Sequence, residues 1–379
     1  VGEEGVECVV TLAIDDMRDP AKYEAYLRPI LQRLKQIDGR APVSIMTNSV
    51  KPDDPQLQTW LQEGLSIECH TFDHPCPILA GGDIKKAKAT YDRCVDLIGT
   101  IPNNKPVAFR TPCCDSLNTV SPRLFSEIIN KTTPAGNFLQ LDSSVFTLYT
   151  ADDPSIPREL LYDPDGKEKF RKYLPRGLKR GDLTHDGFVN YIENYPYPYV
   201  IQRTCWEFPC VVPSDWSAQH LHKPNNPDTV RDWKAALDIT VHKQGVFNLV
   251  FHPHNWIKPE QVVELIDHAV TKHGKKVKFL TFKECVERLN TNLNLGSGLG
   301  ESRGLTCDVA LFDVDGDDRM DVVYRASTTV WKSLWNEPTR SWKHEPLPGI
   351  LADAFFGLLP SARFGVLDPN GSPSALTLV

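Results

Sequence analysis

The sequence lacks several features that mark common classes of protein. Its ten cysteines include no Cys-x-x-Cys pair, so a zinc site built from thiolates is not expected. The formal net charge is -7, whereas proteins that bind nucleic acid need a basic surface. No apolar stretch approaches the roughly 20 residues that a helix needs to cross a bilayer. We therefore expect neither nucleic acid as a partner nor a membrane span.

The amino-acid composition is typical of a globular protein. Its 379 residues are 41% apolar and 24% charged, which suits a sizeable core and two or three domains of about 100–200 residues each. The even number of cysteines permits disulfides, and Cys205 and Cys210, which flank W-E-F-P, could be bridged. The first residue is Val1 rather than methionine, which indicates a trimmed start, so the lack of a visible signal peptide is uninformative.

Predicted strands and helices alternate over about the first 290 residues. Apolar runs predict strands at residues 6–14, 43–46, 65–69, 107–109, 138–145, 208–212, 247–251 and 277–280. Apolar residues at helical spacing predict helices at residues 20–37, 55–63, 83–98, 121–130, 166–173, 184–194, 227–243, 259–272 and from 281 onward. This alternation favours a (β/α) barrel or a doubly wound sheet, and in both folds the active site lies at the carboxyl ends of the strands.

Chemically active side chains follow directly after these strands. Asp15-Asp16, His70, Arg110 and His252 each stand just past a strand end. Polar residues that only satisfy a core would have no reason to gather at one end of successive strands. We therefore expect these side chains to meet at one site.

The segment C-H-T-F-D-H-P-C-P carries two histidines, His70 and His74, four residues apart. The prolines that follow disfavour a continuous helix, so the segment is expected to be a loop after a strand. Neutral imidazoles are good ligands for zinc and similar ions. With one carboxylate of the Asp15-Asp16 pair they make a three-ligand site with room for water and substrate, as in catalytic zinc.

The other residues at these strand ends can supply an acid and a base. Adjacent aspartates at a strand end diverge, so the carboxylate that is not a ligand can take a proton from metal-activated water. A protonated His252 could give a proton to a leaving amine, and Arg110 could pair with the base or form a plain salt bridge. A two-histidine, one-carboxylate set also suits non-haem iron(II), but the second aspartate argues against an oxygenase.

Four motifs resemble the polysaccharide deacetylase family, the NodB-like group of carbohydrate esterase family four. They are I-D-D at 14–16, H-T-F-D-H at 70–74, R-T-P at 110–112 and L-V-F-H-P at 249–253, in the family's order and spacing. The resemblance covers about residues 6–290. It implies a distorted (β/α) barrel of seven or eight strands, and a secreted, periplasmic or cell-surface protein of a bacterium.

The resemblance also implies a role for each residue and a cofactor. The metal is expected to be Zn2+, with Co2+, Ni2+ or Mn2+ as alternatives. The implied roles are general base for Asp15, metal ligand for Asp16, His70 and His74, support of the base for Arg110, general acid for His252 and acetyl-methyl pocket for Leu249.

The sequence departs from the family pattern beside these motifs. Ala13-Ile14 stand where the family has Thr-Phe, Met17 stands where it has Gly, and Cys113-Cys114 replace a frequent aromatic. The metal set is intact, so hydrolysis is expected, whereas the shape of the substrate is in doubt.

The family's motif that couples an aspartate to His252 is ambiguous in this sequence. Asp215-Trp216 is one candidate and Asp142, in L-D-S-S-V, is the other. Trp216 could equally pack at the rim. The run at 191–199, Y-I-E-N-Y-P-Y-P-Y, could line a sugar groove, although loop packing is the commoner role. Surface positions are expected for His220, His222 and His254.

Beyond residue 291 the sequence changes character. Residues 292–304 form a Gly-rich linker, and 305–379 have the short strands and turns of a β-rich unit. The segments L-F-D-V-D-G-D and V-L-D-P-N-G-S match position for position, which suits part of a β-propeller. The first resembles the calcium loop of FG-GAP or VCBS repeats, with Ca2+ expected at Asp313, Asp315, Asp317 and Asp321.

The sequence as a whole predicts a metal-dependent hydrolase that removes acetyl groups from a carbohydrate. N-deacetylation of N-acetylated amino sugars in a polysaccharide or oligosaccharide is the first hypothesis. An O-acetyl esterase or a non-sugar amidase on the same barrel is the alternative. A carbohydrate-binding protein without activity is disfavoured, because both Asp15 and His252 are present.

Overall fold

The computed structural model describes most of the first 297 residues and parts of the rest. The residues left undescribed are 1–2, 80–81, 116–123, 130, 175–188, 202–204, 298–308, 313–320, 327–328, 337–338, 340, 348–363, 366–376 and 379. The chain divides into two compact units, Val1–Glu287 and Arg288–Val379. No helix among the described residues is both long and apolar enough to cross a membrane.

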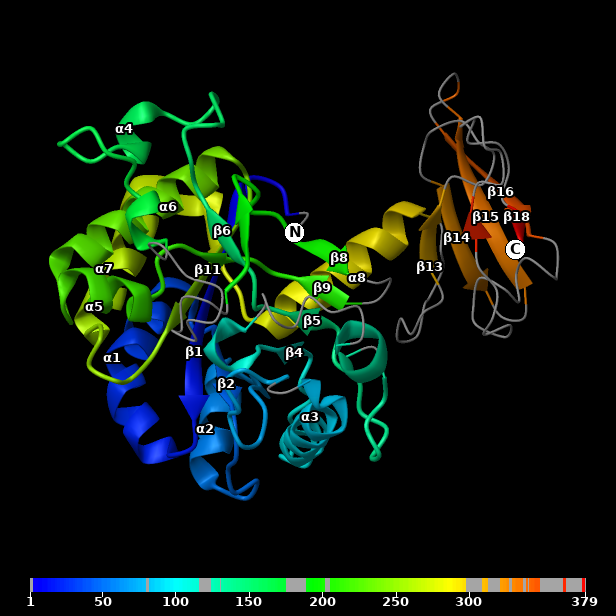
Figure 1. The fold of residues 1–379 in the computed structure, drawn as a ribbon, viewed down its shortest axis with the longest axis horizontal. Helices are drawn as coiled ribbons and strands as arrows, with labels where there is room; N and C mark the ends of the chain where they lie inside the picture. Colours follow the sequence, from blue (N-terminus) through cyan, green and yellow to red (C-terminus); the bar gives the residue numbers. More distant parts are fainter. Residues whose placement is uncertain are drawn as a thin grey trace. The chain divides into compact units, whose positions relative to one another are not determined.

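A curled, mostly parallel sheet forms the centre of the first unit (Figure 1). Its strand order is β11-β1-β2-β3-β4-β5-β9-β8, with β12 also paired to β1. From β1 to β5 the spatial order follows the chain without the reversal of a doubly wound sheet. The bounds are β1 (Cys8–Met17), β2 (Val43–Thr47), β3 (Ser66–Cys69), β4 (Ala108–Phe109), β5 (Leu141–Asp142), β8 (Tyr199–Ile201), β9 (Cys205–Glu207), β11 (Val246–Phe251) and β12 (Val277–Phe279).

A second, smaller sheet interrupts the barrel. It consists of the parallel strands β10 (Cys210–Val211), β6 (Phe146–Leu148) and β7 (Tyr191–Glu193). β10 also packs against β11, so the two ends of the curled sheet approach each other through this small sheet. The fold is therefore a distorted (β/α) barrel, which confirms the predicted fold class.

Most of the helices cover the outside of the curled sheet (Figure 1). The helices are α1 (Pro20–Asp38), α2 (Pro55–Glu63), α3 (Ile84–Gly99), α4 (Arg158–Leu161), α5 (Asp215–His222), α6 (Pro227–His242), α7 (Pro259–His268) and α8 (Phe282–Ser297), and α4 packs on α6. The side chains of Asp19, Asp54 and Asn226 accept hydrogen bonds from the first turns of α1, α2 and α6. Each of these helices has proline in its first turn, so the sequence itself fixes where it begins.

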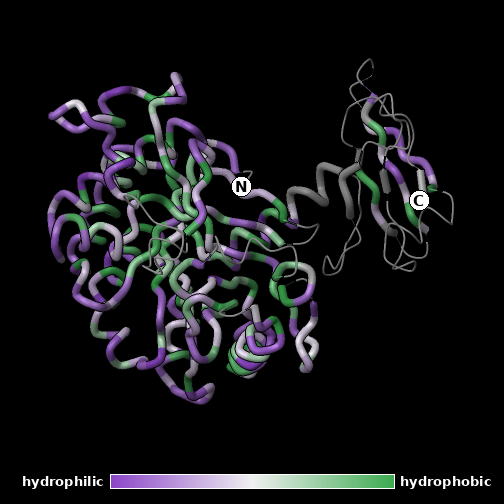
Figure 2. Tube along the Cα trace, viewed as in Figure 1, coloured by the Kyte–Doolittle hydropathy of each residue, from purple (hydrophilic) through white to green (hydrophobic). Residues whose placement is uncertain are grey.

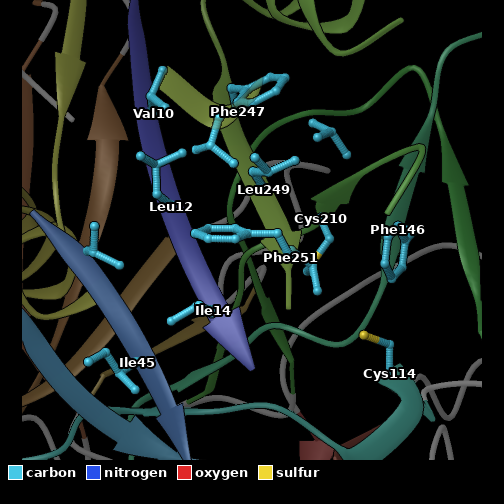
Figure 3. Packing of buried hydrophobic residues seen from close by; sticks show 14 of the residues in the cluster. Val10, Leu12, Ile14, Ile45, Cys114, Phe146, Cys210, Phe247, Leu249 and Phe251 are labelled. Carbon is cyan, nitrogen blue, oxygen red and sulfur yellow. The ribbon is translucent and has the colours of Figure 1, made fainter. Parts of the chain in front are cut away.

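Apolar side chains of the strands fill the layer between the sheet and its helices, where Phe251 of β11 packs against Tyr26 of α1. Leu12 and Ile14 of β1 lie beside Leu249 and Phe251 of β11, and all four are fully buried (Figure 3). The apolar segments gather on the inner strands, while hydrophilic residues follow the outer helices and loops (Figure 2). Both faces of β1 are covered, which explains its nearly continuous apolar sequence.

The segment between 138 and 212 differs most from the sequence-based expectation. The predicted helix at 166–173 is wrong, since only Arg171–Tyr173 forms a short 3-10 turn. The predicted helix at 184–194 is wrong where it is described, because Tyr191–Glu193 pairs with β6 as β7. Helical spacing of apolar residues in so short a segment is overridden by pairing with a neighbouring strand.

The second unit contains a small antiparallel sheet, as predicted. Its strands are β13 (Val309–Phe312), β14 (Asp321–Ala326), β15 (Thr329–Asn336) and β16 (Ser341–Pro346), and β17 (Phe364–Gly365) pairs with β18 (Thr377–Leu378). The calcium-loop prediction falls on undescribed residues, except that Asp321 begins β14. α8 extends to Ser297, within the segment predicted to be a linker, so the domain boundaries and the repeat assignment stay predictions.

Candidate active site

A cavity of about 290 Å³ lies at the carboxyl ends of the barrel strands. Its wall contains charged, imidazole and aromatic side chains from widely separated parts of the chain. The lining residues are Asp15, Asp16, His70, His74, Cys113, Cys114, Phe146, Tyr173, Val189, Tyr191, Val212, Ser214, Trp216, Ser217, Val250, His252 and Trp256. Of the strand-end residues singled out in the sequence, Asp15, Asp16, His70 and His252 line this cavity.

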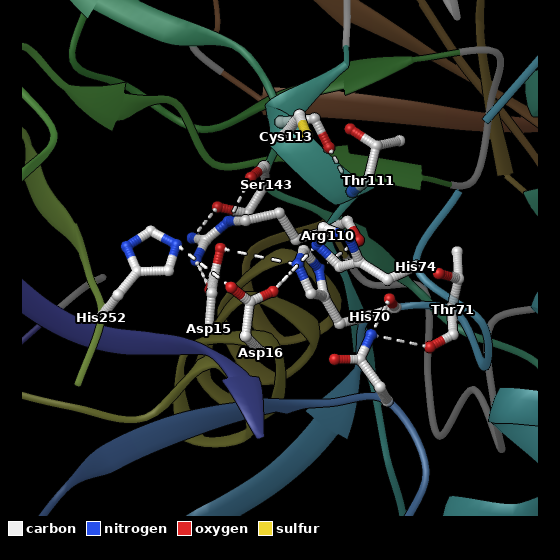
Figure 4. Close-up of polar contacts among 12 residues, drawn as sticks. Asp15, Asp16, His70, Thr71, His74, Arg110, Thr111, Cys113, Ser143 and His252 are labelled. Carbon is white, nitrogen blue, oxygen red and sulfur yellow. Dashed lines mark hydrogen bonds and ion pairs between the residues drawn. The ribbon is translucent and has the colours of Figure 1, made fainter. Parts of the chain in front are cut away.

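Asp16, His70 and His74 converge on one point of this cavity (Figure 4). The Oδ1 atom of Asp16 lies 2.8 Å from Nε2 of His74 and 3.4 Å from Nε2 of His70. The three candidate ligand atoms all lie within 4.8 Å of one another. This is the set that the sequence predicted as metal ligands.

Hydrogen bonding around His70 indicates that this set fits a cation. Its Nδ1 lies 2.8 Å from the carbonyl oxygen of Arg110, which can only accept, so Nδ1 carries the proton. In the neutral ring Nε2 then presents a lone pair to Asp16 Oδ1, a buried oxygen that accepts no hydrogen bond. Two acceptors that face each other are stabilised by a cation between them, so the residues fit a divalent metal.

The backbone around these ligands is bent into an unusual conformation. Asp16, Thr71 and His74 all have positive φ, at 68°, 60° and 57°, a region that residues other than glycine rarely occupy. The side-chain amide of Asn48 donates to the carbonyl oxygens of His70 and Thr71, at 2.6 and 2.9 Å, and so holds the histidine loop. Such strain is found where function needs a particular side-chain direction.

A disulfide joins the histidine loop to the loop after β4. It links Cys76 to Cys113, with a Cα–Cα distance of 6.1 Å. The suggested bridge between Cys205 and Cys210 is wrong, because both are buried free cysteines. Cys210 instead lies 3.4 Å from a guanidinium nitrogen of Arg110, inside the barrel.

Asp15 forms a buried ion pair with Arg110. The Asp15 Oδ1–Arg110 Nη1 distance is 2.6 Å, and both side chains are buried. Arg110 also donates to the carbonyl and hydroxyl oxygens of Ser143, at 2.6 and 2.7 Å. Burial alone would lower the pKa of Arg110, but the charge of Asp15 raises it, so the guanidinium stays charged. Asp15 thus has a fixed rotamer beside the metal set.

His252 lies on the opposite side of the two aspartates (Figure 4). Its Nδ1 lies 2.8 Å from Asp215 Oδ1, and its backbone N–H donates to Asp215 Oδ2 at 2.7 Å. Burial alone would lower the pKa of His252, but the charge and hydrogen bond of Asp215 raise it to about 9. Nε2 is left facing the cavity, 3.9 Å from Asp16 Oδ2.

The structure separates the two candidates for the aspartate that couples to His252. Asp215 is the first residue of α5 and contacts His252 directly. Asp142 is instead buried beside Glu207, away from the cavity, and burial raises the pKa of both carboxyls. The coupling that the sequence left open is therefore made by Asp215.

Two further predictions for the cavity wall have different outcomes. Trp216 lines the cavity, in agreement with the interpretation that it belongs to the same motif as Asp215. Leu249 does not, because alternation along β11 turns it away from the barrel interior, toward the helices, and turns Val250 to the cavity. Tyr191 is the member of the tyrosine run that lines the cavity.

His254 is a site residue that the sequence analysis placed at the surface. Its Nε2 lies 3.0 Å from Asp16 Oδ2, and its ring stacks on His252. Burial would raise the pKa of Asp16, but the adjacent imidazoles of His254, His70 and His74 lower it. The only signal in the sequence was the spacing H-P-H after a strand, which places alternate histidines on one side.

Comparison with known proteins gives a family match over the first third of the chain and several similar solved structures. Residues 3–124 match the family model described as polysaccharide deacetylase. No curated protein matches the sequence. A Mycobacterium smegmatis protein described as a polysaccharide deacetylase is 14% identical, with a TM-score of 0.47 over 77% of this chain and 93% of that one.

Two further solved structures are similar at lower scores. Peptidoglycan deacetylase PdaC from Bacillus subtilis is 14% identical, with a TM-score of 0.37 over 78% of this chain and 97% of that one. A family 4 carbohydrate esterase from Streptomyces lividans, in complex with acetate, is 10% identical, with a TM-score of 0.37 over 72% and 91%. The segment that supplies both aspartates, both loop histidines and Arg110 therefore matches the polysaccharide deacetylase family.

Proposed function

We propose that the protein is a metal-dependent hydrolase that removes acetyl groups from N-acetylated amino sugars of a polysaccharide or oligosaccharide. The observation that carries this proposal is the meeting of Asp16, His70 and His74 in a cavity that also contains Asp15 and His252. A metal set with a carboxylate on one side and a protonated imidazole on the other has the parts that amide hydrolysis needs.

Asp16, His70 and His74 would hold the metal, with zinc as the proposed ion and Co2+, Ni2+ or Mn2+ as substitutes. When bound, such a metal lowers the pKa of a water molecule and polarises the acetyl carbonyl. Asp15 would accept the proton of the attacking water at its free oxygen. Arg110, which binds the other oxygen at 2.6 Å, keeps that carboxylate oriented.

His252 would give its Nε2 proton to the leaving nitrogen as the carbon–nitrogen bond breaks. Asp215 holds the ring through Nδ1 and keeps it protonated near neutral pH, since the pKa of His252 is about 9. An amine leaves poorly unless it is protonated, so a firmly protonated acid favours amide over ester substrates. The products are acetate and a free amine.

The cavity wall suits a sugar. Tyr173, Tyr191, Trp216 and Trp256 line it, and aromatic faces pack well against the apolar faces of pyranose rings. The cavity, at about 290 Å³, has room for a sugar ring with its acetyl group. This supports a carbohydrate substrate over an extended peptide.

The direct test is acetate release from a panel of N-acetylated oligosaccharides and O-acetylated xylan, with and without a chelator. We expect release from the N-acetylated members, loss of release after chelation, and recovery when Zn2+ is added back. Asp16→Ala serves as the matched inactive control. Release only from the O-acetylated substrates would favour the esterase alternative, and release that survives chelation would contradict the metal mechanism.

We also propose that the C-terminal unit binds Ca2+ through the aspartates at 313–321, on the basis of their spacing alone. The expected result is a higher melting temperature of that unit when Ca2+ is added to the full-length chain. An unchanged melting temperature would contradict it.

A further inference from the structure

A second group of one aspartate and two histidines lies outside the cavity, where α6 meets the end of α7. The Oδ1 atom of Asp238 lies 2.9 Å from Nε2 of His268 and 2.7 Å from Nε2 of His273. As in the cavity, a single carboxylate oxygen faces two Nε2 atoms, and all three atoms lie within 4.8 Å of one another.

An interruption of the helix brings these two histidines together. They are five residues apart, a spacing that would place them on different faces of a regular α-helix. After His268 the chain instead forms a π-helical turn, η6 (Ala269–His273), whose hydrogen bonds join residues five apart. The two rings consequently lie 6.0 Å apart and point at the same carboxylate of α6.

The dimensions of the group suit a small divalent ion. Zinc bonds of about 2.0–2.1 Å in a tetrahedron separate their ligand atoms by about 3.3 Å, a few tenths more than the distances seen here. His268 and His273 are 20% and 11% exposed, so small rotations of their rings can open that space. This partial exposure of both imidazoles gives an ion and its water access from solvent.

One neighbouring cation competes for the same carboxylate. Lys272 Nζ lies 2.8 Å from Asp238 Oδ2, but the lysine side chain is 51% exposed and can turn into solvent. An aspartate carboxylate is ionised at neutral pH, as a metal ligand must be.

We propose that Asp238, His268 and His273 bind a second divalent transition-metal ion of the zinc class. This ion fastens α6 to the junction of α7 and η6, and a water molecule completes its coordination. Without an ion, the same residues would form a cluster of ion pairs. The zinc stoichiometry distinguishes a metal site from such a cluster.

The test is a zinc titration of the chelator-treated, full-length chain, with Ca2+ in excess to fill sites built from oxygen ligands. Two ions are expected in the wild type, one in Asp16→Ala, and none in Asp16→Ala combined with His273→Ala. The count does not use hydrolysis, so it can succeed even if the proposed acetyl substrate is wrong. An Asp16→Ala protein that binds no zinc would overturn the proposal.

A second pair of variants covers the case in which loss of an imidazole harms the fold. In the Asp16→Ala background, Lys272→Ala removes the competing cation without removing a ligand, so zinc should bind about tenfold more tightly. The control is His242→Asn, which changes an exposed histidine at the end of α6 that lies outside the group and should leave the zinc affinity unchanged. Unchanged or weaker zinc binding after Lys272→Ala, or a change of the same size in the His242→Asn control, would contradict the assignment.

Discussion

The molecule contains two groups of identical composition in very different surroundings. Asp16, His70 and His74 lie at strand ends, whereas the second group joins two helices. In both, one carboxylate oxygen faces two imidazole Nε2 atoms at about hydrogen-bond distance. What differs is the neighbourhood, and chemistry depends on the neighbourhood as much as on the ligands.

The group in the cavity has a carboxylate and an imidazole beside it. Asp15 and His252 flank Asp16, and each is held by a buried partner of its own, Arg110 or Asp215. Beside Asp238, the charged neighbour is Lys272, which occupies the carboxylate instead of assisting a reaction. We infer that one aspartate and two histidines serve hydrolysis in the cavity, and that a second set of the same residue types joins two helices.

The largest effect is expected from removing the base that distinguishes the first group. Asp15→Asn keeps the shape of the side chain but cannot accept a proton. Turnover should fall by about 10²–10⁴-fold. Zinc stoichiometry should stay the same, because Asp15 is not a ligand in the proposal. Acetate release and metal content measured on one preparation check both parts, and undiminished turnover would remove Asp15 from the mechanism.

The next effect concerns the acid. His252 must be protonated to act, and its pKa is raised to about 9, so activity should persist until the pH rises through that value. Asp215→Asn removes the main cause of the raised pKa and returns it toward the ordinary value of about 6.5. The alkaline limb of the pH–rate profile should therefore move to lower pH, with about a thirtyfold loss at pH 8. An unmoved alkaline limb would contradict this role for the pair.

The disulfide is a third difference between the two groups, since it anchors only the histidine loop. Cys76 and Cys113 close a loop of 37 residues, so Cys76→Ser should lower the free energy of unfolding by about 2–4 kcal/mol. Urea unfolding with and without a reductant measures this. Wild type in reductant should resemble the variant, and the variant should not respond further to reductant.

The smallest effect is expected at His254, which donates to the outer oxygen of Asp16. His254→Asn should weaken metal binding at the cavity by about tenfold, because residues that orient a ligand typically contribute that much. Zinc affinity of the cavity site, compared with the His242→Asn control, measures the loss. Equal affinities in the two variants would show that His254 only packs against His252.

The sequence was sufficient to predict the barrel and the meeting of Asp16 with His70 and His74, because each depends on local patterns. Buried parallel strands are nearly all apolar, and their carboxyl ends share one edge, so Asp16 and His70 could be placed together without coordinates. The four-residue spacing to His74 and the following prolines then indicated the loop.

Other features depend on tertiary contacts that leave no local signal. One such feature is the choice between Asp142 and Asp215 as the partner of His252. The segment after β5 is held against the buried Glu207, to which the backbone N–H groups of Ser144 and Val145 donate, and this keeps Asp142 away from His252. The π-helical turn before His273 interrupts a segment whose apolar spacing looks like one continuous helix over 259–272. Spacing alone therefore could not reveal the second group.

The most direct test of the central claim is anomalous diffraction at the zinc absorption edge from crystals of the zinc-loaded, full-length protein. We predict a peak within about 2.0–2.2 Å of Asp16 and of both Nε2 atoms of His70 and His74. Zinc-loaded, active protein with no peak at these three residues would contradict the proposal that they share one catalytic ion.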